Sequence, residues 1–243
     1  MSVKPRCWAA IRGDCAGGIS GEHLISKCLF SQSKIFVQGF PWCAGQEREV
    51  GVASTTANIL CRKHNNELSP LDDAAAHAVD LFQNLGAAKA PNKPVDARLL
   101  ERWLLKTAIN SSVGQSRHIG VGMADSQAGW PAPYLVDVAF GGLSFSHCMG
   151  AYVLTSERPR KRRYGEILIV PIVKDEFVGG FYFSLRGVDV FLSLSPGLEL
   201  STLRALGVSG LSESVLDAQL KQLRTTPSLL LKSERYMPNS LHG

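Results

Sequence analysis

The chain has 243 residues, of which 45% are apolar and 19% charged, and its formal charge at pH 7 is +5. This composition is typical of a globular protein and excludes a fully disordered chain. No stretch approaches the roughly 18 uninterrupted apolar residues of a membrane span. The first residues, MSVKPRCW, also lack the apolar run of a signal peptide, so we expect a cytosolic protein.

The six cysteines are unevenly distributed, because five of them fall within the first 61 residues. In a reducing compartment, cysteines are more often buried thiols or metal ligands than disulfides. Such clustering predicts a small N-terminal unit that is stabilised by a staple rather than by a large apolar core. The cysteines are Cys7, Cys15, Cys28, Cys43, Cys61 and Cys148.

Residues 1–68 are rich in glycine, which breaks any long element. Within them, the segments 23–30, 34–40 and 49–54 each fit either a short strand or a single helical turn. A helix is then predicted to begin at Ser69, as the N-cap, with a proline at the first helical position. Its apolar residues repeat at helical spacing, and Gly86 can end it: Leu71, Ala75, Ala78, Phe82 and Leu85.

A second helix is predicted from Ala97 to about Val113, capped by Asp96 and ended by Gly114. Its expected buried stripe consists of Leu100, Trp103, Leu104 and Ala108.

Residues 134–194 have the pattern of an antiparallel sheet of four or five strands, and about 212–224 fits one more helix. The sequence therefore predicts an α+β chain, with an N-terminal unit at 1–86 and a second region of unknown role at 87–243. The strand-like segments are YLVDVAF (134–140), residues 145–154, EILIVPIV (166–173), FYFSL (181–185) and VDVFLSL (188–194).

The stretch LCRKHNNELS contains a candidate metal corner, since Cys61 and His64 have the spacing with which one turn grips a tetrahedral zinc ion. A second pair of ligands is needed, and Cys7 with Cys15 is the best candidate. Cys28 or Cys43 is the competing source of a ligand. The remaining interpretation is that the four residues are separate and bind no metal.

Glu22 and His23 lie in a glycine-rich turn, GISGEHLIS, that leads into an apolar segment. Histidine can accept a proton near neutral pH without a large pKa shift. An amide oxygen of Asn65, directly behind the metal corner, is a hard ligand of the kind that magnesium prefers. On a strand, however, Glu22 and His23 point to opposite faces unless the backbone bends between them.

In order, the pattern C…C…EHLIS…LCRKHNN resembles the zinc-bearing branch of the HNH, or ββα-metal, endonucleases, which have a treble-clef-like fold. The likeness covers about residues 5–85. It implies that Glu22 binds a catalytic Mg²⁺ or Mn²⁺, that His23 is the general base and that Asn65 is a second cation ligand. It also implies that Asn58 orients the base. Structural zinc would be held by Cys7, Cys15, Cys61 and His64.

The chain departs from the family pattern at three positions. The acidic residue, Glu22, is aspartate in most members, His64 replaces a second cysteine, and Asn58 lies closer to Cys61 than the family's asparagine.

The resemblance implies hydrolysis of a DNA phosphodiester bond, most readily in a duplex, that leaves a 5′-phosphate. A basic run, RPRKRR, is either a solvated hairpin tip or a phosphate contact, and the C-terminal region could serve a protein partner or a homodimer. The alternative function is a non-catalytic zinc module that binds nucleic acid or protein, in which Glu22 caps a turn or pairs with Arg62. The basic residues are Arg158, Arg160, Lys161, Arg162 and Arg163.

Overall fold

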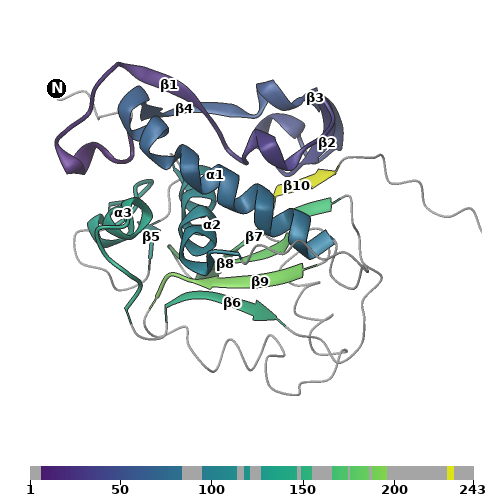
Figure 1. Cartoon of the computed structure of the whole chain (residues 1–243). Coiled ribbons are helices and arrows are strands. Elements are labelled where there is room, and N and C mark those ends of the chain that lie inside the picture. Colours follow the sequence, from purple (N-terminus) through teal and green to yellow (C-terminus); the bar gives the residue numbers. More distant parts are fainter. Residues whose placement is uncertain are drawn as a thin grey trace, which may run out of the picture.

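A computed structural model shows an α+β chain in which helices lie between a two-stranded sheet and a larger sheet (Figure 1). It describes residues 7–83, 95–113, 118–120, 127–146, 149–154, 166–174, 176–185, 188–195 and 229–232. The predicted α+β class is therefore confirmed. No helix in these ranges is long and apolar enough to cross a membrane.

In the N-terminal unit, two strands that are far apart in the sequence pair with each other, and the second leads into a helix; β2 and β3 lie between them in the chain and join the larger sheet. Strand β1 (Ile19–His23) pairs antiparallel with β4 (Thr56–Cys61), and helix α1 (Arg62–Gln83) follows at once. The register slips once, because Ser20 lies opposite Leu60 whereas Glu22 lies opposite Ala57. The extra residue on β4 forms a bulge between these two pairs, and Glu22 and His23 then pair in regular register with Ala57 and Thr56, with no slip between them.

The predicted start of the first helix at Ser69 is wrong, because α1 begins seven residues earlier, at Arg62. The first backbone N–H groups of the helix are satisfied by the loop that precedes β1. Arg62 N donates to Gly18 O at 2.8 Å, and Lys63 N donates to Ala16 O at 3.2 Å. Pro70 therefore lies inside the helix, where it cannot donate to the carbonyl of Asn66. The Ser69 hydroxyl donates to that same carbonyl, at 2.9 Å, and so replaces the missing bond.

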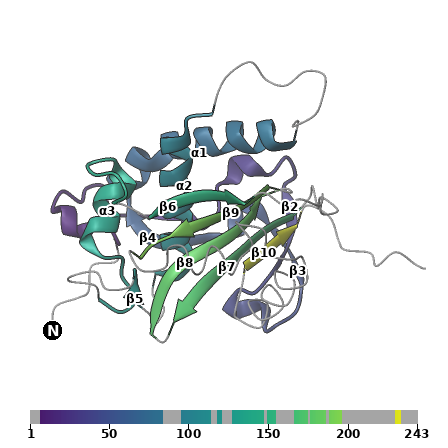
Figure 2. The same cartoon turned by 90° about the horizontal axis from the view of Figure 1, so that it is seen from below.

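The larger sheet combines strands from both ends of the chain, in the order β3-β2-β10-β7-β8-β9-β6 (Figure 2). These pairings are antiparallel, and β5 (His118–Ile119) adds a short parallel pairing to β8. The prediction of an antiparallel sheet is confirmed for β6 (Gly150–Leu154), β7 (Glu166–Lys174), β8 (Phe177–Leu185) and β9 (Val188–Ser193). The additional strands are β2 (Lys34–Gln38), β3 (Arg48–Gly51) and β10 (Leu229–Lys232).

The segment YLVDVAF was predicted to be a strand, and it is instead helix α3 (Pro133–Phe140). Proline at its first position and Gly141 in the left-handed conformation after its end are helix signals. The buried positions are Leu135, Val136, Val138 and Ala139. Buried residues at this spacing are typical of a helix. The alternation in VDV, which suggested a strand, covers only three residues of the helical pattern.

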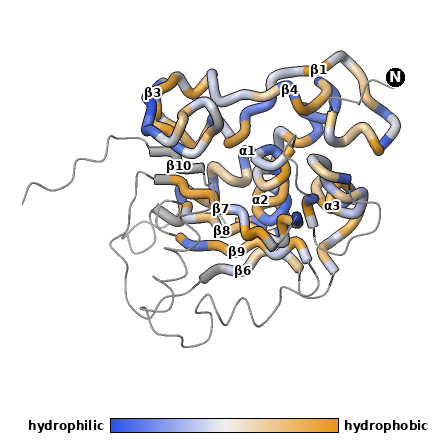
Figure 3. The backbone as a smooth tube through the Cα atoms, turned by 180° about the vertical axis from the view of Figure 1, so that it is seen from behind, coloured by the Kyte–Doolittle hydropathy of each residue, from blue (hydrophilic) through white to orange (hydrophobic). Residues whose placement is uncertain are grey.

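Helix α2 (Ala97–Ser112) matches its prediction and forms the centre of the core. The side chain of Asp96 accepts from the backbone N–H groups of Arg98 and Leu99, which fixes the start of the helix. The predicted stripe of Leu100, Trp103, Leu104 and Ala108 is buried. Figure 3 shows hydrophobic segments gathered where α2 meets the strands of the sheet.

The remaining short elements are single 3-10 turns. Two of them fall in segments for which the sequence fitted either a short strand or a helical turn. Residues 23–30 contain the end of β1 and the turn Lys27–Leu29, and residues 49–54 contain the end of β3 and the turn Val52–Ser54. The other 3-10 turns are Ala10–Arg12 and Pro41–Cys43. The predicted helix at 212–224, the basic run at 158–163 and Cys148 lie outside the described residues.

Candidate metal centre

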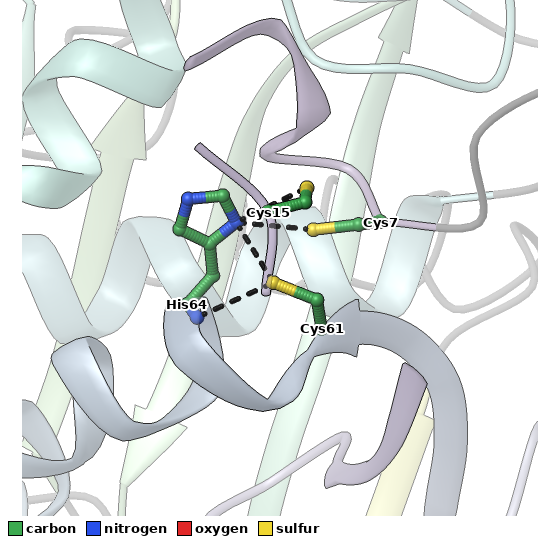
Figure 4. A group of neighbouring side chains, drawn as sticks. All are labelled: Cys7, Cys15, Cys61 and His64. Carbon is green, nitrogen blue, oxygen red and sulfur yellow. Dashed lines mark hydrogen bonds between the residues drawn. The ribbon is translucent and has the colours of Figure 1, made fainter. Parts of the chain in front are cut away.

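The four predicted zinc ligands come together at the start of α1 (Figure 4). One ligand atom from each of Cys7, Cys15, Cys61 and His64 lies within 4.8 Å of all the others. Cys7, Cys61 and His64 are buried, while Cys15 is exposed at the rim. This arrangement can hold a metal ion such as zinc.

The competing cysteines are elsewhere. The exposed thiol of Cys28 donates to the carbonyl of Asp72 at 3.2 Å, and the buried thiol of Cys43 faces the carbonyl of Val37 at 3.8 Å. Neither belongs to the cluster, so among the described residues the Cys7–Cys15 pair faces the Cys61–His64 pair.

The spacing of the donor atoms fits a tetrahedral site. Nδ1 of His64 lies 3.3 Å from the sulfur atoms of Cys7 and Cys61 and 3.7 Å from that of Cys15. Zinc–sulfur and zinc–nitrogen bonds of about 2.3 and 2.0 Å place sulfur and nitrogen ligands roughly 3.5 Å apart. Small adjustments are therefore enough for one ion to contact all four atoms.

The loop that carries Cys15 is folded directly onto the start of α1. Besides the two backbone bonds that begin the helix, the N–H of His64 points at the sulfur of Cys61, 3.5 Å away. Gly17, with a φ of 78°, lets the loop approach the helix, since a Cβ there would lie 3.0 Å from Cβ of Arg62. Cys7 is fixed from the other side, because the N–H of Trp8 bonds to the carbonyl of Ile59 on β4.

Asp14 holds the imidazole of His64 from behind. Its Oδ1 lies 2.7 Å from Nε2, which leaves Nδ1 free to face the three sulfur atoms. Hydrogen bonds from Lys63 and His64 lower the pKa of Asp14 to about 2. The ring edge of His64 also packs against Phe140 of α3, with ring centroids 5.3 Å apart. Pairing of a ligand histidine with a carboxylate is a common way to fix its tautomer in metal sites.

The thiols are in different electrostatic surroundings. Burial raises the pKa of Cys7 to about 12. Burial also acts to raise the pKa of Cys61, but backbone hydrogen bonds, first from His64, lower it overall. Because a metal binds thiolates, its binding must displace the protons of these groups.

Glu22, near the end of β1, is buried in an ion pair that the sequence did not indicate. Its Oε1 lies 2.7 Å from Nζ of Lys106 and accepts from Nδ2 of Asn110 at 3.2 Å, both on α2. The pairing of Glu22 considered above, with Arg62, is therefore replaced by one with Lys106. Burial raises the pKa of Glu22, and the neighbouring Lys106 opposes that shift.

The ion pair belongs to a continuous hydrogen-bonded network. Lys106 also contacts both carboxylate oxygens of Asp72 on α1, at 2.9 and 3.1 Å. Asp72 accepts from the hydroxyl of Ser26, which in turn accepts from the indole of Trp103 at 2.7 Å. At the other end, Asn110 accepts from the indole of Trp8 at 3.0 Å. The network joins the N-terminal unit to α2.

His23 ends β1, next to Glu22, and is half-buried. Its Nε2 is enclosed and has no hydrogen-bond partner within the described residues. Burial, followed by the positive charge of Lys27, lowers the pKa of its imidazole. The side chain is therefore neutral at neutral pH, which is the form that can accept a proton.

The two asparagines are placed differently. Asn65, in the first turn of α1, donates from Nδ2 to the hydroxyl of Ser20 at 3.1 Å, which leaves its amide oxygen free of that bond. Ser20 lies on β1, two residues before Glu22. Asn58 is exposed on β4, beside the bulge, and its side chain makes no hydrogen bond within the described residues. The structure thus gives no sign that Asn58 orients His23.

Four residues of these networks, Asp14, Asp72, Lys106 and Asn110, were not among the site residues predicted from the sequence. A signal was available for two of them, because Lys106 and Asn110 follow the predicted core residue Trp103 by three and seven positions. A charged and an amide side chain on the apolar stripe of a helix must find buried partners. No comparable pattern marks Asp14.

In comparisons of the chain with models of protein families, with curated proteins and with solved structures, nothing matched. Its function must therefore be argued from its residues.

Proposed function

We propose that the chain is a metal-dependent endonuclease of the HNH type, which hydrolyses phosphodiester bonds in double-stranded DNA. One observation carries the proposal: a strand ends in Glu22–His23, pairs with a second strand, and that strand leads into a helix that begins at the cysteine–histidine cluster. Together, β1, β4 and α1 support the ββα arrangement that the resemblance implies, with β2 and β3 inserted between the two paired strands.

Zinc in the cluster would have a structural role. Four protein ligands leave no position open for water or substrate. The ion would instead fix Cys7 and Cys15 against the first turn of α1, in a region where the loop has little apolar side chain to bury. By fixing the first turn of α1, the ion would also hold Asn65 in place beside β1.

His23 is the proposed general base. Since Nε2 is enclosed, Nδ1 is the nitrogen that would take a proton from the attacking water. The lowered pKa keeps the ring neutral and able to accept that proton at physiological pH.

Glu22 and Asn65 are the proposed ligands of Mg²⁺ or Mn²⁺. Both contacts of Glu22 use Oε1, so Oε2 has no hydrogen bond within the described residues, and the amide oxygen of Asn65 is likewise available. Carboxylate and amide oxygens suit a hard cation, whereas thiolates and imidazole suit zinc. When bound, such a cation would stabilise the charge that develops on the phosphate and on the leaving oxygen.

The alternative is a zinc module that binds DNA or protein without cleaving it. The burial of Glu22 in an ion pair with Lys106 favours this reading, because such a pair can be purely structural. A homodimer or a protein partner that uses the C-terminal region is compatible with either function.

Incubation of zinc-loaded protein with supercoiled plasmid, with no added cation or with Mg²⁺ or Mn²⁺, distinguishes the two functions. The endonuclease produces nicked or linear DNA when Mg²⁺ or Mn²⁺ is present, and its ends can be religated without a kinase because they carry 5′-phosphates. Retardation of the plasmid on a gel without any cleavage would establish the binding module instead.

A further inference from the structure

Helix α2 supplies the two groups that hold Glu22, although it lies outside the region that resembles the nucleases. Lys106 and Asn110 both contact Oε1 of Glu22, at 2.7 and 3.2 Å. The amide of Asn110 also lies 3.3 Å from the carbonyl of His23, so one side chain ties down both residues of the Glu–His pair.

Lys106 is itself held in place. Its side chain is 2% exposed, and its ammonium lies between Glu22 and the two carboxylate oxygens of Asp72. Asp72 is fixed in turn by the hydroxyl of Ser26, which Trp103 contacts. A lysine on a protein surface is a flexible point charge, but the ammonium of Lys106 is held in place by two carboxylates.

We propose that Lys106 is a positioning residue of the proposed nuclease site: it fixes Oε1 of Glu22, and thereby presents Oε2 to the divalent cation. The inference rests on the proposed function, and it assigns to α2 an outer shell around the cation. A carboxylate ligand that is hydrogen-bonded through one oxygen is oriented before the cation arrives, and loss of such a partner typically lowers metal affinity about 10- to 100-fold.

A second effect of Lys106 has the opposite sign. An ammonium close to the cation repels it, so removal of the charge alone would strengthen cation binding. The contacts favour orientation as the larger effect, because the ammonium bonds to the oxygen that faces away from the proposed ligand atom. The sign of the change in affinity therefore decides between positioning and repulsion.

The experiment measures Mn²⁺ binding to the zinc-loaded full chain by electron paramagnetic resonance, without any DNA. The variants are Lys106→Met, which removes the donor, and Lys106→Arg, which keeps a charged donor. Lys34→Met is the matched control, since it removes the same charge from an exposed lysine that pairs with Glu49 on the neighbouring strand. We expect Lys106→Met to weaken Mn²⁺ binding at least tenfold, Lys106→Arg to restore part of the affinity and Lys34→Met to leave it unchanged.

Wild-type affinity, or tighter binding, in a folded Lys106→Met protein would overturn the inference. If that variant loses the circular dichroism of the wild type, Asp72→Asn replaces it, because this change keeps the shape of a partly exposed residue and releases Lys106. It should weaken Mn²⁺ binding severalfold, and an unchanged affinity counts against the inference equally. Glu22→Gln distinguishes failure of the role of Lys106 from failure of the cation site. If Glu22→Gln does not alter Mn²⁺ binding, the proposed cation site itself fails.

Discussion

Asp14 shows how one partly exposed side chain can set the properties of a buried metal ligand. It bonds to the ring nitrogen of His64 that faces away from the three sulfur atoms. We predict that Asp14→Asn lowers zinc affinity about 10- to 100-fold, because a neutral amide accepts from Nε2–H less strongly than a carboxylate does and therefore orients the ring less firmly. Competition with a chromophoric chelator measures this affinity.

Lys63→Met is the control for that substitution. It removes the ion pair of Asp14 with Lys63 but leaves the bond to His64. Equal losses of zinc affinity in the two variants would mean that the ion pair, and not the histidine contact, matters.

Cys61 tests the metal centre more severely, because it is the buried ligand that joins β4 to α1. We predict that Cys61→Ser lowers both the zinc content and the melting temperature, since zinc binding and folding of the N-terminal unit are coupled. Cys28→Ser, which changes an exposed thiol outside the cluster, should alter neither. Metal analysis and thermal unfolding of protein purified without added zinc provide the measurement, and a Cys61→Ser protein with full zinc would refute the assignment.

Spacing and ligand type predicted two residues of the metal centre, Cys61 and His64, but left the second pair open among the cysteines and did not predict the residues around Glu22. Cys61 and His64 lie three residues apart, so local geometry brings them together whatever the rest of the chain does. Lys106 meets Glu22 only because α2 packs against α1, which follows the β1–β4 pair, and the two residues are 84 positions apart in the sequence. No local pattern contains that contact.

Among the elements, α2 has the most clearly defined start. The carboxylate of Asp96 accepts from two N–H groups, at 3.0 and 3.1 Å, that the helix itself cannot satisfy. We predict that Asp96→Ala destabilises the protein by about 1 kcal/mol. Asp96→Asn should cost much less, since asparagine is an equally good N-cap residue, and urea unfolding of both variants measures the difference. A loss of the same size in both would show that charge, and not the cap bond, is responsible.

The errors in element assignment have local causes. Ser69 and Pro70 form a strong helix-start signal, but Ser69 bonds backward to Asn66 and the helix begins at the metal centre instead. The first turn of α1 takes its hydrogen-bond partners from the Cys15 loop, which no capping pattern in the sequence reveals. In α3, by contrast, Pro133 and Gly141 were visible in the sequence and outweigh the strand-like alternation between them.

At the scale of the molecule, Asn110 joins three parts of the chain: Trp8 near the metal centre, Glu22 at the end of β1 and α2 itself. We predict that Asn110→Ala lowers the free energy of unfolding by about 1–3 kcal/mol, because it leaves buried polar groups without partners. Asn58→Ala, at an exposed position, should change it by less than about 0.5 kcal/mol. Equal stability of the two variants in urea would contradict the view that this network fastens the N-terminal unit to α2.

The full set of strands in the large sheet, and their order, could not have been predicted from the sequence. Strands β7, β8 and β9 follow one another closely, and their antiparallel pairing follows from short connections, whereas β6 pairs with the more distant β9. Strand β2, however, pairs with β10 across nearly the whole chain, with Val37 opposite Leu231. Short apolar segments specify that a strand forms, but they contain little information on which distant partner it takes.

The nuclease proposal depends on His23, and its removal tests the proposal most directly. The measurement is the rate of plasmid cleavage by zinc-loaded His23→Ala protein in Mg²⁺, compared with wild type. The control is His77→Ala, which changes a histidine that is also half-buried but lies on α1. We predict a loss of about 10²–10⁴-fold for His23→Ala alone, with zinc content and melting temperature close to those of wild type. A folded, zinc-loaded His23→Ala protein that cleaves at the wild-type rate would contradict it.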